Sequence, residues 1–113
     1  MTTRKGRARK AGAPASVPHR PHLLEWLKDA ENAAAYIQAA IEEGDAGDLL
    51  HALRNVAEAR GGIAIIAEKT GLNREALYRT LSKRGNPQLK SLAAILDATG
   101  LRLSVTPAQR KAA

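Results

Sequence analysis

The side chains best suited to chemistry lie between Arg74 and Lys83. At about 100° per residue, an α-helix over this stretch has two faces. One face carries Ala76, Leu77, Thr80 and Leu81, and the other carries Arg74, Glu75, Tyr78, Arg79, Ser82 and Lys83. Arg can pair with guanine and Glu with cytosine, while Tyr and Ser suit phosphates or base edges. The polar face therefore favours reading of DNA, and the alternative is the solvated face of an amphipathic helix.

The residues before this helix fit a tight connection to another helix. Ala67 is small enough to let two helices approach closely, and Gly71 can take the positive φ that ends the first helix. Leu72 is then expected to be buried. Asn73 can accept a hydrogen bond from a free backbone N–H of the second helix. This order predicts a helix-turn-helix over residues 63–83, with its second helix in the major groove.

The net charge of +7 is distributed unevenly along the 113 residues. Residues 1–22 contain six basic residues and no acid, and residues 23–68 contain nine acids against three bases. Residues 69–90 contain six bases against one acid. The basic charge thus coincides with the predicted reading helix, and Lys69 and Lys83 are predicted to contact phosphates. The acidic half would be repelled by DNA and is free for another partner.

Composition narrows the class of protein. Cysteine is absent, and Ala, Leu and Ile dominate the apolar positions, which suits close-packed helices in a reducing cytoplasm. No apolar run approaches the roughly 18 residues of a membrane span, and the basic N-terminus lacks the apolar region of a secretory signal. We therefore expect a cytoplasmic location and no membrane partner.

No residue pattern indicates catalysis. His19 and His22 have a metal-like spacing without a third ligand, and Glu42 and Glu43 are neighbours that point to different faces of a helix. Glycine-rich phosphate-binding motifs are also absent. We therefore expect that the protein is not an enzyme and that it has no metal site and no cofactor.

Apolar spacing and turn residues predict the other elements. A short apolar helix spans residues 23–29, and longer helices run from Asp29 to Gly44 and from Asp45 to Gly61. A Gly-Asn-Pro turn at residues 85–87 precedes a last helix, which carries the stripe Leu89, Leu92, Ala93 and Leu96.

The end of the chain has a different period. Leu101, Leu103 and Val105 alternate with polar residues, which predicts one short strand. A lone strand has unpaired backbone groups on both edges. It could pair with the same strand of a second subunit in a homodimer, or the segment could be an extended tail packed on the last helix.

Together these patterns predict an all-α, five-helix helix-turn-helix domain over residues 23–105, with the short C-terminal strand at its end. Residues 1–22 are predicted to be a disordered basic arm, because Pro14, Pro18 and Pro21 interrupt any helix. The arm could bind phosphates non-specifically or simply solvate the chain. Residues 106–113 are predicted to be a C-terminal tail.

Residues 36–105 resemble the addiction-module antidote family, the HigA-type antitoxins with a phage-repressor-like helix-turn-helix. The matching segments are YIQAAIEEGD (36–45), ALRNVAEARG (52–61), IAEKTGLNREALYRTLSKRGNPQL (66–89) and LDATGLRLSV (96–105). The resemblance implies a dimer that represses its own operon and neutralises a RelE-like ribonuclease toxin. Carried over residue by residue, it implies a DNA-facing set of Asn73, Arg74, Glu75, Tyr78, Arg79 and Lys83.

A toxin that grips RNA is basic, so its inhibitor should offer acidic side chains. Glu42, Glu43 and Asp45 are therefore candidates for toxin contact, and the alternative is that they only keep a helical surface soluble. Ile65 departs from the family pattern, which usually has a polar residue there. Either a neighbouring helix covers Ile65 or it belongs to an interface.

Two other functions remain open at this point. The first is a stand-alone, prophage-type transcriptional regulator without a toxin partner. The second is a protein-binding inhibitor in which the helix-turn-helix is only a scaffold, although the basic charge of residues 69–90 argues against it.

Overall fold

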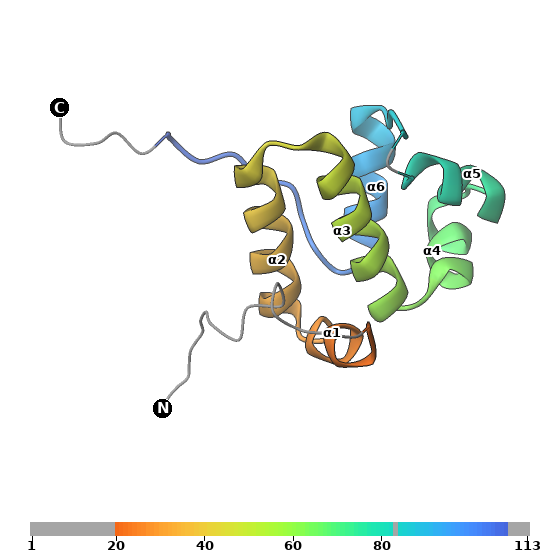
Figure 1. The fold of residues 1–113 in the computed structure, drawn as a ribbon. Coiled ribbons are helices and arrows are strands. Elements are labelled where there is room, and N and C mark those ends of the chain that lie inside the picture. The colour runs from red at the N-terminus through yellow and green to blue at the C-terminus, as the bar shows by residue number, and fades with distance from the viewer. Residues whose placement is uncertain (1–19, 83, 109–113) are drawn as a thin grey trace, which may run out of the picture.

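The computed structural model describes residues 20–82 and 84–108. This part of the chain is all-helical and contains no strand, which confirms the predicted all-α class (Figure 1). The helices are α1 (Arg20–Trp26), α2 (Ala30–Glu43), α3 (Ala46–Ala59), α4 (Ile63–Thr70), α5 (Arg74–Thr80) and α6 (Leu89–Ala98).

Local chemistry sets the boundaries of α2 and α3. The Asp29 carboxylate accepts hydrogen bonds from the N–H groups of Glu31 and Asn32, over 2.9 and 3.0 Å. Gly44 ends α2 at φ +85°, a conformation that glycine adopts without steric cost. Asp45 then caps α3 by accepting from the Asp48 N–H over 2.9 Å. These ends agree with the predicted turn positions.

The core lies around α3. In Figure 1, α3 stands between α2 on one side and α4 and α5 on the other, and α6 lies partly behind α3, on the side that faces α4 and α5. Large apolar side chains of α3, α4, α5 and α6 are at most 1% exposed there, and these are Leu53, Val56, Ile66, Leu77 and Ile95. The reading helix predicted from sequence is therefore held on the same apolar core as the rest of the domain.

The helix count of five was wrong, because the described residues form six helices. The short α1 is part of the domain, since Leu27 just after it is fully buried. It also begins at Arg20, inside the segment predicted to be a disordered arm. Pro21 does not prevent this, because a proline in the first helical turn lacks only an N–H that would have no helical partner. The rest of the arm, residues 1–19, lies outside the described residues.

The C-terminal strand is not present in the single chain. Residues 101–108 adopt neither helix nor strand. Leu101 packs against the core, whereas Leu103 is 40% exposed and Val105 is 97% exposed. The period-2 pattern identified an extended segment, but a strand also needs a partner for its backbone groups.

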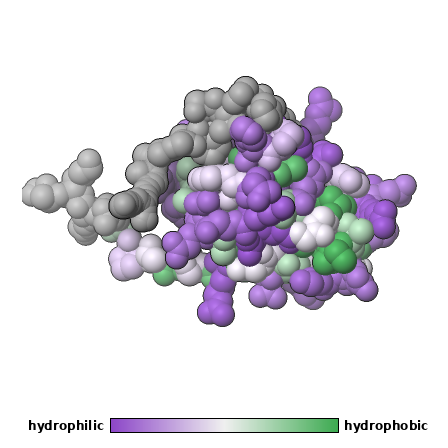
Figure 2. All heavy atoms as spheres, turned by 90° about the horizontal axis from the view of Figure 1, so that it is seen from below, coloured by the Kyte–Doolittle hydropathy of each residue, from purple (hydrophilic) through white to green (hydrophobic). Residues whose placement is uncertain are grey.

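Three large aliphatic side chains on helices α2, α4 and α6 are also exposed. Leu89, which was predicted on an inward stripe, stands in the first turn of α6 and is exposed, and so is Ile41 in the last turn of α2. Ile65 of α4 is also exposed, so no neighbouring helix covers it fully. Seen from below, the surface is mostly hydrophilic, and apolar side chains gather toward the side of α4 (Figure 2). The interface alternative for Ile65 stays open.

Candidate nucleic-acid interface

Helices α4 and α5 are joined by a turn of three residues, 71–73. Gly71 adopts φ +80°, and its N–H donates to the Ala67 carbonyl over 2.9 Å. The Thr70 hydroxyl donates to the Ile66 carbonyl over 2.8 Å and accepts from the Leu72 N–H over 3.3 Å. These hydrogen bonds are all made within the turn and the end of α4. They hold the direction of the chain between α4 and α5.

The predicted cap of α5 is confirmed. Asn73 Oδ1 accepts a hydrogen bond from the Ala76 N–H over 2.6 Å. Leu77 and Leu81 attach the other side of the helix to the core and are at most 1% exposed. Leu72, expected to be buried, is half-buried and packs against that core. The cap and the two leucines together hold a short helix that would be marginal on its own.

The outward face of α5 contains most of the residues predicted from sequence. Asn73, Arg74, Glu75, Tyr78 and Arg79 are all exposed. Such a face presents two guanidinium groups, one carboxylate, one amide and one phenol to the same side of the molecule. These groups match the hydrogen-bonding patterns of base edges and phosphates. Contact with DNA itself stays a prediction.

The remaining predicted DNA contacts differ in their surroundings. Lys69 is exposed near the end of α4. Ser82 is half-buried, and its hydroxyl donates to the Arg79 carbonyl over 2.8 Å, so it closes the end of α5 instead of facing outward freely. Lys83 falls between the two described ranges.

One neighbour of α5 was not predicted from sequence. Arg54 comes from α3, and its guanidinium carbon lies 5.0 Å from the centre of the Tyr78 ring. A cation over an aromatic face at this distance is attracted by the ring quadrupole. No sequence pattern indicated this contact, because Arg54 belongs to the acidic segment and helical periodicity alone does not show which helix its side chain meets.

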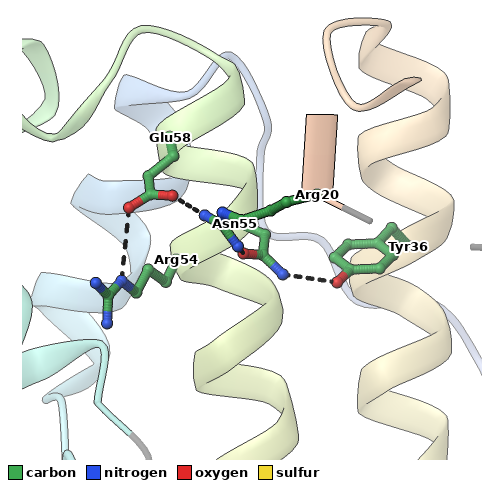
Figure 3. Close-up of polar contacts among 5 residues, drawn as sticks. All are labelled: Arg20, Tyr36, Arg54, Asn55 and Glu58. Carbon is green, nitrogen blue, oxygen red and sulfur yellow. Dashed lines mark hydrogen bonds and ion pairs between the residues drawn. The ribbon is translucent and has the colours of Figure 1, made fainter. Parts of the chain in front are cut away.

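Arg54 belongs to a group of polar side chains that joins α1, α2 and α3 (Figure 3). Its Nε lies 3.6 Å from Glu58 Oε2, and the other carboxylate oxygen of Glu58 binds Arg20. Arg20 also donates to Asn55 Oδ1 over 2.6 Å, and Asn55 Nδ2 donates to the Tyr36 hydroxyl over 3.0 Å. Asn55 is only 2% exposed, so both ends of its amide are satisfied inside the domain.

The acidic residues proposed for a second partner lie away from α5. Glu42 and Glu43 are exposed in the last turn of α2, and Asp45 is exposed at the start of α3. In Figure 1, the turn between α2 and α3 stands on the other side of α3 from the outer end of α5. The structure therefore separates an acidic end from the polar face of α5.

The described ranges contain neither a metal-ligand cluster nor a membrane-spanning helix. No three His, Cys, Asp or Glu side chains group there as metal ligands would, and His19 lies outside those ranges. None of the six helices combines the length and the apolar character that crossing a membrane requires.

The fold and this site define a small all-helical protein with an exposed, hydrogen-bonding helix on one side and an acidic turn on another. Residues 20–107 match a family described as "probable addiction module antidote protein". The chain is also 32% identical over 83 residues to a protein of Haemophilus influenzae that is described only as uncharacterized. That alignment covers 74% of this chain and 84% of the relative. No solved structure matches.

The chain therefore belongs to the addiction-module antidote family. An antidote of an addiction module is the antitoxin of a toxin–antitoxin pair, so membership points to an antitoxin role and to a toxin as partner. The match begins at Arg20, where α1 begins, which agrees with a domain that includes this helix.

Proposed function

We propose that this protein is a HigA-type, DNA-binding antitoxin with a phage-repressor-like helix-turn-helix formed by α4 and α5. It represses its own operon as a dimer and neutralises a RelE-like ribonuclease toxin in the cytoplasm, by binding and not by catalysis. One observation carries the DNA-binding part of the proposal. The capped, core-anchored α5 exposes Arg74, Glu75, Tyr78 and Arg79 on one face.

Charge supports this face over the others as the DNA surface. Residues 69–90 hold six bases against one acid, whereas residues 23–68 hold nine acids against three bases. Phosphate attraction depends on basic groups that stand near the reading element, because screening limits their range to about 10 Å. An inhibitor whose helix-turn-helix is only a scaffold would not need this concentration of charge.

The test is a titration by fluorescence anisotropy with DNA from upstream of the gene. A shuffled duplex of equal length and base composition is the comparison, and both are measured at several salt concentrations. We expect tighter binding to the upstream DNA, and an affinity for both duplexes that falls as salt rises. Equal affinities for the two duplexes would contradict autorepression through α5.

The toxin part of the proposal rests on the family and on the acidic turn between α2 and α3. The stand-alone regulator is the second candidate function, and gene order separates the two. A small, basic reading frame beside this gene supports the antitoxin, and its absence supports the regulator. Because α3 separates the acidic turn from α5, one molecule could hold toxin and operator at the same time (Figure 1).

Charge reversal at the end of α2 tests the toxin surface. The Glu42→Lys/Glu43→Lys variant is expected to associate with the neighbouring toxin about tenfold more slowly at low salt, with a smaller change in dissociation, because steering acts on the on-rate. Stopped-flow kinetics measures both rates. Operator binding should be retained, since both residues are exposed and lie away from α5.

Asp45 needs a different substitution in this test. Its carboxylate accepts the Asp48 N–H, so reversal to Lys would damage α3 as well as change the charge. Asp45→Asn removes the charge and keeps a capping oxygen. Asp97→Lys serves as the control, because it reverses an exposed acid on α6. An unchanged on-rate in the double variant would exclude this turn as the toxin surface.

The C-terminal segment is the proposed dimer contact. Leu101, Leu103 and Val105 alternate along an extended backbone that forms no strand in the single chain. Two such segments could pair across a two-fold axis and place two reading helices about 34 Å apart, one turn of DNA.

Leu103→Pro is expected to convert the dimer to a monomer, because proline removes a backbone donor from the pairing. Leu103→Val keeps that donor and should remain dimeric. Sedimentation velocity at micromolar concentration measures both. A monomeric wild-type protein, or a dimeric Leu103→Pro variant, would contradict this contact.

A further inference from the structure

We infer that Arg54 of α3 is a positioning residue for base reading, which acts by holding the Tyr78 ring in place on α5. The inference rests on the proposed DNA binding and adds to it a residue outside the helix-turn-helix. Its starting point is the distance of 5.0 Å between the Arg54 guanidinium carbon and the centre of the Tyr78 ring. A contact of this kind favours one orientation of the ring over the others.

Tyr78 is in a position where such a contact matters. Its side chain is 41% exposed, so the core does not enclose it and other rotamers are accessible. A ring that is ordered only on binding loses conformational entropy at that moment, whereas a ring that is already ordered does not. Arg54 lies over the ring, and the exposed remainder of the Tyr78 side chain stays available to DNA.

Arg54 is itself held in place by an ion pair with Glu58. Glu58 is one helical turn further along α3, and its Oε2 lies 3.6 Å from Arg54 Nε. The Arg54 and Glu58 side chains are 41% and 24% exposed, so water screens this ion pair in part, and its geometry matters more than its strength. Arg20 binds the second oxygen of the same carboxylate, so Glu58 cannot turn away from Arg54 without breaking another ion pair.

The support continues into the interior. Arg20 Nη1 donates to Asn55 Oδ1 over 2.6 Å, and Asn55 is 2% exposed and bonded to Tyr36. Figure 3 shows these side chains as one continuous group across α1, α2 and α3. The position of Tyr78 on the reading helix thus depends on contacts that begin on the opposite side of α3.

A phosphate ligand is the competing role for Arg54, and its contacts argue against that role. The Glu58 carboxylate offsets the charge of Arg54 and faces its Nε, whereas Arg74 and Arg79 have no ion-pair partner in the described ranges. A phosphate ligand and a positioning residue also predict different salt dependence, which the experiment uses.

The experiment is a double-mutant cycle on operator affinity. Arg54→Met keeps much of the side-chain length and removes the charge, and Tyr78→Ala removes the ring. We expect Arg54→Met to weaken operator binding about two- to fivefold, the range of an exposed cation–π contact. The slope of affinity against salt should not change. In the Tyr78→Ala background, Arg54→Met should have no further effect.

A second measurement needs no DNA. Arg54→Met and Glu58→Gln should each shift the ring proton signals of Tyr78 in the NMR spectrum of the free protein. Arg54→Met should leave the ring signals of Tyr36 nearly unchanged. Arg54→Lys should retain part of the affinity, because it keeps the charge without the planar group. Circular dichroism verifies that each variant keeps its helices.

Three results would overturn the inference. The first is an equal loss of operator affinity on Arg54→Met in the wild-type and Tyr78→Ala backgrounds. The second is a salt slope lowered by about one unit, which identifies a phosphate ligand. The third is an unchanged Tyr78 signal in the free variant. If the wild-type protein binds no DNA specifically, the proposed function and the inference fail together, whereas specific binding with any of the three results removes the inference alone.

Discussion

Replacing both Arg74 and Arg79 with alanine is expected to abolish the preference for operator DNA. A side chain that reads a base edge contributes about 1–3 kcal/mol to discrimination, and tenfold in affinity corresponds to about 1.4 kcal/mol. Both arginines are exposed, and neither has an ion pair in the described ranges, so their loss should leave the fold intact. Anisotropy titrations with operator and shuffled DNA measure the effect.

Lys69→Ala and Arg102→Ala are the matched comparisons. Lys69 is exposed next to the turn, and as a phosphate ligand it should weaken binding to all sequences alike and lower the salt slope by about one unit. Arg102 is exposed after α6 and should have little effect. A double arginine variant that binds operator as tightly as the wild type would exclude α5 as the reading helix.

Leu77→Ala is expected to cause the largest loss of stability. Leu77 is fully buried and attaches α5 to the core, opposite the face with Arg74 and Arg79. Truncating a buried leucine costs about 2–5 kcal/mol, since transfer free energy is lost and a cavity is left. This is a large part of the roughly 5–15 kcal/mol that stabilises a typical domain. Operator binding should weaken too, because α5 loses its anchor.

Urea unfolding followed by circular dichroism measures this change. Leu89→Ala is the control with the same chemistry, because Leu89 is 71% exposed and its truncation should alter stability by less than about 1 kcal/mol. Similar losses of stability in the two variants would show that α5 is not anchored through Leu77.

The helices could be predicted from sequence because their ends are local. Asp29, Gly44, Asp45, Gly71 and Asn73 each act within a few residues of their own position, through a cap or a positive φ. The two faces of α5 follow from the same short-range geometry. The exposed residues of the candidate site were therefore predictable, although their contact with DNA remains a prediction.

The contacts of Arg20 and Arg54 could not be predicted in this way. Arg20 and Asn55 are 35 positions apart, and Arg54 meets Tyr78 only because α3 packs near α5. Which side chains meet across helices depends on packing angles, and periodicity alone does not give these. The prediction of a C-terminal strand was wrong for a related reason. The apolar alternation is local, but a strand also needs a pairing partner for its backbone groups, and periodicity does not show whether one is present.

The helix cap formed by Asp45 limits how the acidic turn between α2 and α3 can change during evolution. Its carboxylate holds the first turn of α3, which restricts the position to the few residue types that can cap a helix. The Glu42 and Glu43 side chains cap no helix. The Gln38 amide donates a hydrogen bond to the Glu42 carboxylate, and this contact is exposed. With the proposed toxin surface at this turn, mutations that adapt it to an altered partner are expected to accumulate at positions 42 and 43, while position 45 stays confined to capping residues.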